Sequence, residues 1–278
     1  MLNKTHPAQR RLILEELLAH ALSVQQRKQA RRQECATALP PNRGLIERLM
    51  QALPFQLTSA QQRAVEEISA DMQQPYPMQR LLQGDVGSGK TIVAALVALQ
   101  AIENGFQVGL MAPTELLSEQ HRHHFCTWFE PLGLKVVNLT GKMRVKARSA
   151  ALQAIESGEA AMVIGTHALF QETVRFEKLG LIIIDEQHRF GVQQRLALWE
   201  KGLQATQQAH QLFMTATPIP RTLAMTTMTE LDLSFIDEMP PGRLPIKTVV
   251  LSAGRRGEVI ERIRQLGLQK NRFIGSVL

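Results

Sequence analysis

A glycine-rich loop is the feature that most limits what this chain can fold into: Gly84-Asp85-Val86-Gly87-Ser88-Gly89-Lys90-Thr91. The octapeptide fits the phosphate-loop pattern of Gly, any four residues, Gly, Lys, and Ser or Thr. Residues 78–83 before it form an apolar segment typical of a strand, and residues 92–99 after it are rich in Ala and Leu, as in a buried helix. Since strand, loop and helix in this order are the context that the motif requires, a chance glycine-rich turn is the weaker alternative.

The residue types of the loop predict its ligand. Glycines allow the backbone to turn tightly and to point its N–H groups inward. The helix that follows adds its own unpaired amides and the positive end of its dipole. Lys90 offers a charge to the β- and γ-phosphates, and Thr91 offers a hydroxyl to Mg²⁺. The sequence therefore predicts a site for a nucleoside triphosphate and its magnesium ion.

Beyond the loop, strand-like and helix-like segments alternate. The expected strands are residues 108–111, 135–139, 161–164, 181–184 and 211–214, and the expected helices between them include 115–129 and 145–155. Continuous apolar strands that alternate with helices indicate a parallel sheet covered on both faces. The expected fold class is therefore α/β, built around a P-loop.

Polar residues directly follow the expected strands, where a parallel sheet collects its ligands. Besides the loop, these are Pro113-Thr114, Thr166-His167, Asp185-Glu186 and Thr215-Ala216-Thr217. Asp185 can hold the Mg²⁺ that also contacts Thr91, directly or through water. Glu186 can orient or deprotonate the attacking water. The alternative for this pair, a solvated acidic turn, rarely follows four buried aliphatic residues.

Three other side chains are weaker candidates. His188 either relays the state of the γ-phosphate to Thr215 or Thr217, or is a hydrogen-bonded loop histidine. Upstream of the loop, a helix is expected to begin near residue 60, with Thr58 or Ser59 as its cap. The Gln61 carboxamide presents a donor and an acceptor side by side, which suits the adenine edge, and Phe55 could stack on the base. Without the loop downstream, both would be ordinary residues of a helix start.

Composition leaves the partner open. The chain has 278 residues, a net charge of +7 and 44% hydrophobic residues, enough for a buried core. Basic residues gather in residues 1–50, in 255–272 and at Lys142, Arg144, Lys146 and Arg148, which is consistent with a polyanion partner or with ordinary solvated faces. Two lone cysteines, Cys35 and Cys126, indicate neither a metal site nor a disulfide framework. With no expected membrane span or signal peptide, the predicted location is the cytoplasm.

The N-terminal segment is expected to be an amphipathic helix. Pro7 is followed by leucines at 12, 14, 17, 18 and 22 among charged residues, and a polar, basic continuation runs to Glu34. Its apolar stripe either packs on the nucleotide domain or has its partner N-terminal to this chain. Leu39-Pro40-Pro41-Asn42 is expected to mark a boundary after it.

Together the motifs resemble those of superfamily-two helicases, and in finer detail those of the RecG family of bacterial branched-DNA helicases. The resemblance is carried by residues 83–91, 112–117, 184–192, 214–224 and 237–243, and it covers the chain from His6 to about Arg264. The transcription-repair coupling translocase shares much of the pattern. The pair Gln187-His188 and the run Pro240-Pro241-Gly242-Arg243 favour RecG.

This resemblance implies a RecA-like domain that uses ATP and Mg²⁺ to move on double-stranded DNA at stalled forks and Holliday junctions. By the same resemblance, Phe55 and Gln61 would read adenine, and Thr215 and Thr217 would couple the nucleotide state to the DNA track. That track would include Pro113, Thr114, Thr166 and His167. The implied partners are ATP and double-stranded or branched DNA, with no membrane, and a monomer is expected.

The departures from the family's pattern are as informative. RecG enzymes carry an N-terminal wedge domain, and their second motor lobe supplies arginines in a Gln-x-x-Gly-Arg-x-Gly-Arg motif. Here the nearest run is Gly254-Arg255-Arg256-Gly257-Glu258. The chain is therefore expected to be a first motor lobe truncated at both ends, with a helical segment at 1–52, the ATP-binding domain at 53–237, and a linker with the start of a second lobe at 238–278. A nucleotide- or DNA-binding module without turnover is the alternative.

Overall fold

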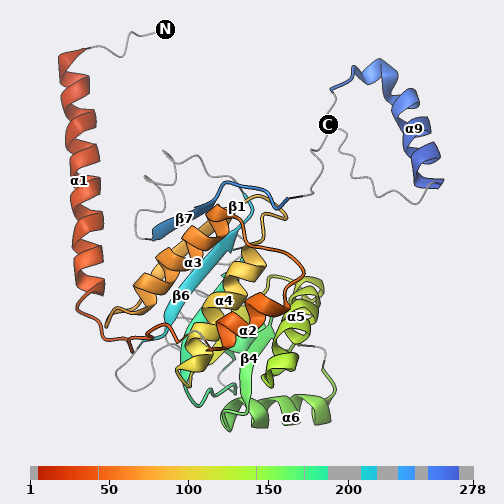
Figure 1. Ribbon diagram of the computed structural model, residues 1–278. Coiled ribbons are helices and arrows are strands. Elements are labelled where there is room, and N and C mark those ends of the chain that lie inside the picture. Colours follow the sequence, from red (N-terminus) through yellow and green to blue (C-terminus); the bar gives the residue numbers. More distant parts are fainter. Residues whose placement is uncertain are drawn as a thin grey trace. The chain divides into compact units, whose positions relative to one another are not determined.

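The computed structural model describes residues 6–42, 44–141, 143–171, 173–186, 208–217, 231–241 and 250–268 (Figure 1). The chain divides into two compact units, Met1–Pro240 and Pro241–Leu278. The first contains the sheet and every candidate site residue. The second contains a 3₁₀ turn, η4 (Ala253–Arg255), and a helix, α9 (Arg256–Leu268).

A parallel sheet of seven strands forms the centre of the first unit within the described residues, in the order β3-β4-β2-β5-β6-β1-β7. The strands are β1 (Gln79–Gly84), β2 (Gln107–Met111), β3 (Lys135–Leu139), β4 (Ala160–Gly165), β5 (Leu179–Asp185), β6 (His210–Thr215) and β7 (Asp232–Ile236). Every residue of β2, β5 and β6 is buried, as their continuous apolar runs predict. The expected parallel α/β fold is confirmed.

Helices cover both faces of the sheet. One face packs against α2 (Gly44–Ala52), α3 (Ser59–Met72), α4 (Lys90–Glu103) and α5 (Glu115–Phe129). The other face packs against α6 (Val145–Glu156) and a 3₁₀ turn, η2 (His167–Phe170). Neighbouring residues of β1 face opposite layers, Leu82 toward α4 and Leu81 toward the other core. The predicted helices at 115–129 and 145–155 are confirmed.

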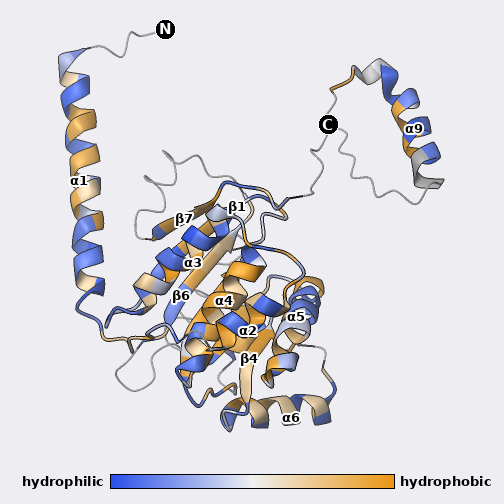
Figure 2. Cartoon of the chain, viewed as in Figure 1, coloured by the Kyte–Doolittle hydropathy of each residue, from blue (hydrophilic) through white to orange (hydrophobic). Residues whose placement is uncertain are grey.

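The helix that follows the loop, α4, is the most buried of the described helices. All its residues from Ile92 to Ala101 are buried, and Figure 2 shows it predominantly orange. Its many alanines carry short side chains, so the helix can lie close to the sheet. This packing fixes the start of α4, and with it the position of the phosphate loop.

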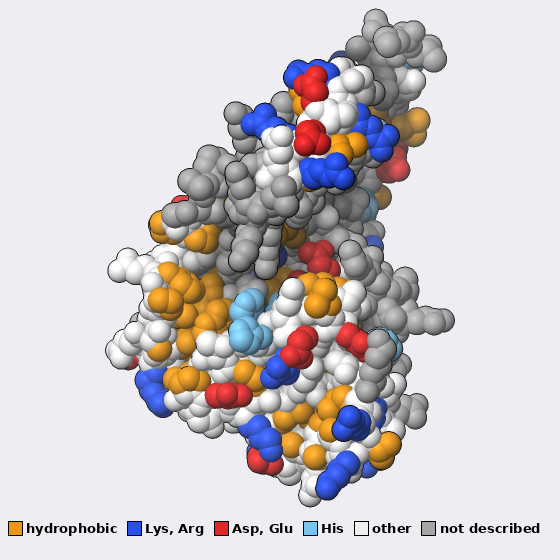
Figure 3. Space-filling model, turned by 90° about the vertical axis from the view of Figure 1, so that its right-hand side faces the viewer, with side chains coloured by type: hydrophobic (Ala, Val, Ile, Leu, Met, Phe, Trp, Pro, Cys, Tyr) orange, Lys and Arg blue, Asp and Glu red, His pale blue; other side chains and the backbone are white. Residues whose placement is uncertain are grey.

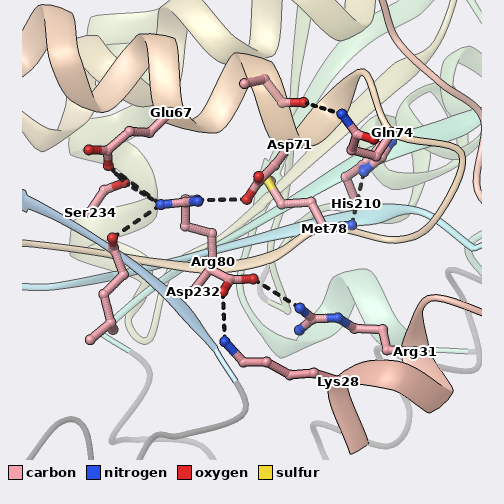
Figure 4. A network of polar contacts seen from close by, with 12 residues as sticks. Lys28, Arg31, Glu67, Asp71, Gln74, Met78, Arg80, His210, Asp232 and Ser234 are labelled. Atoms are coloured by element: carbon pink, nitrogen blue, oxygen red, sulfur yellow. Dashed lines mark hydrogen bonds and ion pairs between the residues drawn. The ribbon is translucent and has the colours of Figure 1, made fainter. Parts of the chain in front are cut away.

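The long N-terminal helix α1 (Pro7–Arg31) is confirmed as a helix, but its apolar side chains do not pack on the nucleotide domain. Six of them are between 50% and 65% exposed: Leu12, Ile13, Leu14, Leu17, Leu18 and Leu22. The helix is held instead near its C-terminal end, where Lys28 and Arg31 both pair with Asp232 of β7 (Figure 4). The first of the two alternatives for its apolar stripe is therefore wrong in this structure.

The segment expected to mark a boundary after α1 is packed into the fold. Leu39 is fully buried, and its N–H donates to the Met72 carbonyl at 2.8 Å. The amide of Gln100, on α4, donates to the Leu39 carbonyl at 2.6 Å, and Asn104 donates to the Pro40 carbonyl at 2.8 Å. Leu39 thus belongs to the same core as the nucleotide domain. The domain limits drawn from the sequence stay a prediction.

None of the described helices is both long and apolar enough to cross a membrane.

Candidate nucleotide-binding site

The phosphate loop begins where β1 ends and closes where α4 begins. Gly87 and Gly89 have φ angles of 80° and 90°, a left-handed conformation that glycine adopts without strain. Gly89 also caps α4, and a Cβ at this position would overlap the Gln61 side-chain nitrogen. The Ser88 N–H donates to the Asp85 carbonyl at 3.0 Å. Backbone geometry therefore requires both glycines, and the close approach of Gln61 is a second reason at Gly89.

Lys90 folds back over this loop. Its Nζ donates to the Gly84 carbonyl at 2.6 Å and to the Asp85 carbonyl at 3.0 Å. Burial lowers the pKa of the Lys90 ammonium below its ordinary value, although the carboxylates of Asp185, Glu186 and Asp85 oppose this by raising it. The lysine predicted from the loop and the acidic pair predicted from β5 therefore lie in one electrostatic cluster.

Gln61 ties α3 to the loop. Its Oε1 accepts from the Thr58 N–H at 2.9 Å and the Gln61 N–H donates to Thr58 Oγ1 at 3.2 Å, a reciprocal cap that begins α3 as expected. Its Nε2 donates to the Ser88 carbonyl at 2.7 Å. Both ends of the carboxamide are thus bonded within the protein, and Phe55 is 46% exposed. The adenine-reading role of Gln61 and Phe55 stays a prediction.

The acidic pair stands where β5 ends. Asp185 is 9% exposed, and its Oδ2 lies 2.8 Å from Nε2 of His121, a residue of α5. Glu186 has a φ of 54°, unusual for a residue with a side chain. Its N–H donates to the Met214 carbonyl at 3.0 Å, which continues the pairing of β5 with β6. Asp185 is thus the last residue of β5, while the backbone turns away from the sheet at Glu186.

The turn at Glu186 brings its carboxylate to the next strand end. Its Oε1 accepts from the Ala216 N–H at 3.2 Å, in the middle of the run Thr215-Ala216-Thr217. The two threonine hydroxyls lie 2.8 Å apart, and the Thr217 N–H donates to Thr215 Oγ1 at 3.2 Å. The structure therefore joins the acidic pair to this run. His188, the third member of the predicted relay, lies outside the described residues.

A cavity of about 340 Å³ opens beside the loop, where β1 and β7 end. The loop side of its wall consists of Gln83, Gly84, Asp85 and Ser88, and Ala216 and residues 235–239 complete it. Glu238 anchors this second side, since its Oε2 accepts from the Ala60 N–H at 3.1 Å. Arg63 pairs with Asp237 at 2.9 Å.

Sequence reasoning did not place residues 235–239 in the site: it gave residues 235–237, at the end of the ATP-binding domain, no role, and it assigned residues 238–239 to a linker. It also missed His121. Neither has a local signal, because each reaches the site only through the packing of a distant element.

The predicted DNA-facing residues follow the neighbouring strands β2 and β4, directly after the ends of these strands. Thr114 caps α5 through its Oγ1, which accepts from the Leu117 N–H at 3.2 Å, and the Ala112 N–H donates to the Gly165 carbonyl at 2.8 Å. Thr114 and His167 are exposed, Pro113 is half-buried and Thr166 is only 3% exposed. The four residues therefore lie at the carboxyl ends of two neighbouring strands, but the Thr166 side chain is buried.

The face of the molecule in Figure 3 carries side chains of both charges. Blue Lys and Arg side chains of the described residues are interspersed there with red Asp and Glu side chains. Within the predicted basic cluster at 142–148, Arg148 donates to the Gln171 side chain. The face in view thus resembles a mixed solvated surface more than a continuous basic patch.

Fold and site together define the class of the protein. A parallel sheet with a phosphate loop after β1, an acidic pair after β5 and a Thr-Ala-Thr run bonded to that pair after β6 is a P-loop nucleotide-binding domain of the helicase type. The sequence model of the DEAD/DEAH box helicases matches residues 58–226, more than half of the chain. The chain belongs to the DEAD/DEAH box helicase family.

The similar proteins narrow the resemblance. The chain is 58% identical to the ATP-dependent DNA helicase RecG of Escherichia coli (strain K12) and 57% identical to that of Haemophilus influenzae. Each match covers 96% of this chain. It spans 38% of the length of either relative. The chain is also similar to a structure of RecG bound to a three-way DNA junction, with a TM-score of 0.83 and 39% sequence identity. This match covers 94% of the present chain and 35% of the RecG chain in that structure. The resemblance to RecG drawn from the motifs is confirmed.

Proposed function

We propose that this chain is the ATP-binding motor lobe of a RecG-type DNA helicase that acts on branched DNA in recombination and repair. The observation that carries the proposal is the contact between the acidic pair and the Thr-Ala-Thr run, Glu186 Oε1 to the Ala216 N–H at 3.2 Å. It connects the group that would activate water to the run that would report the nucleotide state. The helicase relatives and the RecG–DNA structure support this function.

The side chains around the loop fit a nucleotide with its magnesium ion. The Ser88 hydroxyl is buried and has no hydrogen-bond partner among the described residues, so it could donate a hydrogen bond to a phosphate oxygen. Asp185 and Thr91 offer the oxygen ligands that Mg²⁺ prefers. Lys90 would exchange its two carbonyl contacts for phosphate oxygens, which form stronger, charge-assisted bonds. Bound Mg²⁺ would neutralise charge on the phosphates.

ATP binding is tested by calorimetry with Mg·ATP. Lys90→Ala removes a charge-assisted contact and should weaken binding by about 1.5–3 kcal/mol. Lys146→Ala, an exposed lysine on α6, is the matched control and should bind ATP like the unmodified chain. Unchanged affinity in Lys90→Ala would exclude the loop as the nucleotide site.

DNA binding is proposed at the carboxyl ends of β2 and β4, through Pro113, Thr114, Thr166 and His167. Fluorescence anisotropy with a labelled fork should show weak binding that decreases steeply with added salt, because phosphate contacts release counterions. Binding that does not respond to salt would contradict a backbone-tracking surface. Action as a monomer is also part of this proposal.

A further inference from the structure

One buried side chain at the site has no role in the function proposed so far. His121 lies on α5, is 7% exposed, and places Nε2 at 2.8 Å from Asp185 Oδ2. Within the described residues, its Nδ1 has no hydrogen-bond partner. The contact with Asp185 is therefore the one described hydrogen bond of this imidazole.

The contact has a physical reason on both sides. A carboxylate that is nine-tenths buried is costly to desolvate unless a donor faces it. Since a carboxylate oxygen only accepts, a proton of His121 is assigned to Nε2, which donates to Asp185 Oδ2. The bond also fixes the rotation of the carboxyl group, because one of its two oxygens is held by a helix of the core. No described residue donates to the other oxygen, Oδ1.

We propose that His121 is a positioning residue for the nucleotide-bound metal: it holds Oδ2 of Asp185 so that Oδ1 faces the magnesium ion. This inference rests on the proposed function, since the ion would arrive with the nucleotide. Outer partners of this kind orient a ligand and increase its affinity for the metal. His121 itself touches neither nucleotide nor metal.

Two substitutions of equal polarity separate positioning from simple packing. In His121→Gln the side-chain amide nitrogen can occupy the place of Nε2, so the donor to Asp185 is retained. In His121→Asn the amide nitrogen occupies the place of Nδ1 and falls short of Asp185. His123→Asn is the control, because His123 is exposed on the same helix. Thermal unfolding establishes that each variant is folded.

The measurement is the affinity for a non-hydrolysable ATP analogue by calorimetry, once with Mg²⁺ and once with EDTA. His121→Asn should lose about 10–100-fold in the Mg²⁺-dependent affinity and keep its affinity in EDTA. His121→Gln and the control should keep both. Equal losses with and without Mg²⁺, or no loss at all, would overturn the proposal.

A double-mutant cycle with Asp185→Asn gives a second readout. Because His121 acts through Asp185, His121→Asn should cause no further loss of Mg²⁺-dependent affinity in that background, and an additive loss would overturn the proposal. If His121→Asn does not fold, His121→Gln provides the test instead. Retained Mg²⁺-dependent affinity in His121→Gln supports the positioning role of His121, and loss of that affinity contradicts it. An unmodified chain that binds no nucleotide even with Mg²⁺ would instead refute the proposed function.

Discussion

At the scale of single residues, Gln61 shows how one side chain can serve a helix start and a binding loop together. Its carboxamide accepts from the Thr58 N–H and donates to the Ser88 carbonyl. An adenine base that used the same two atoms would have to replace these bonds. The structural role and the predicted adenine-reading role therefore compete for one group, and they differ in what a substitution should change.

Gln61→Ala should lower the free energy of unfolding by about 1–3 kcal/mol, because it leaves the Thr58 N–H of the cap and the buried Ser88 carbonyl of the loop without partners. If Gln61 also reads adenine, the variant should lose preference for ATP over GTP, because guanine places a carbonyl where adenine has its amine. Chemical denaturation and competition binding measure the two effects. Gln62→Ala, exposed on the same helix, is the control for both. An unchanged nucleotide preference would leave Gln61 as a cap residue only.

A buried histidine at the opposite edge of the sheet predicts a pH effect. His210 is 1% exposed, its Nδ1 accepts from the Met78 N–H at 3.1 Å, and its Nε2 donates to the Thr37 carbonyl at 2.9 Å. Burial lowers the pKa of His210, while the bond to Thr37 and the charge of Asp71 oppose this. Protonation would put a hydrogen on Nδ1 and break the bond to Met78.

Since the folded pKa lies below the unfolded value of about 6.5, this contribution is complete above that pH and is lost as the pH falls below it, by at most about 1.4 kcal/mol per pH unit. Urea unfolding of the unmodified chain and of His210→Gln, at about pH 8 and about pH 5.5, measures it. The stability difference between the two proteins should become smaller at the lower pH. A difference that stays constant would mean that His210 does not titrate in this range.

What could be predicted from sequence depended on how local the interactions are. The phosphate loop and the Asp185-Glu186 pair were found because spacing and flanking segments define them. The contact of His121 with Asp185 spans 64 positions and depends on how α5 packs, so no spacing rule indicates it. The wall at residues 235–239 was missed for the same reason.

At the scale of elements, the strand that the sequence did not indicate is the outer strand β7. Its residues alternate between half-buried and buried positions, as at a sheet edge, instead of forming a continuous apolar run. It carries Asp232, which pairs with Lys28 at 2.8 Å and with Arg31 at 2.9 Å. Burial raises the pKa of Asp232, but the positive charges of Lys28, Arg31 and Arg80 together lower it by more. The pKa of Asp232 therefore lies below its usual value.

These two ion pairs are expected to attach α1 to the sheet, and Asp232→Asn should loosen it. Because the Lys28 and Asp232 side chains are about one third exposed and therefore screened by water, the loss of stability should be small, on the order of 1 kcal/mol. Hydrogen exchange should nevertheless become faster in the last turns of α1. Glu15→Gln is the control, since the Arg11–Glu15 pair is exposed within the same helix. Unchanged exchange near Lys28 would show that α1 is held by other contacts.

At the scale of the whole molecule, the chain contains one nucleotide-binding unit and a small second unit, and it spans 38% of the RecG relatives' length. The arginine run considered from the sequence lies in the second unit. There, Arg255 is paired with Glu258 at 2.7 Å. A helicase needs two lobes whose separation changes with the nucleotide state, and the described residues form one such lobe.

The 278-residue chain by itself is therefore expected to bind ATP, to hydrolyse it very slowly and not to unwind forked DNA. Asp185 and Glu186 can hold metal and water, but the γ-phosphoryl group also needs positive charge as its bond breaks, and a missing arginine costs about 10³–10⁵ in rate. ATP hydrolysis and fork unwinding by the purified chain test this, with Glu186→Gln as the control for contaminating activity. Arg255→Ala should behave like the unmodified chain, because Arg255 is paired with Glu258. Rapid DNA-stimulated hydrolysis that disappears in both Glu186→Gln and Arg255→Ala would show that Arg255 supplies the missing charge.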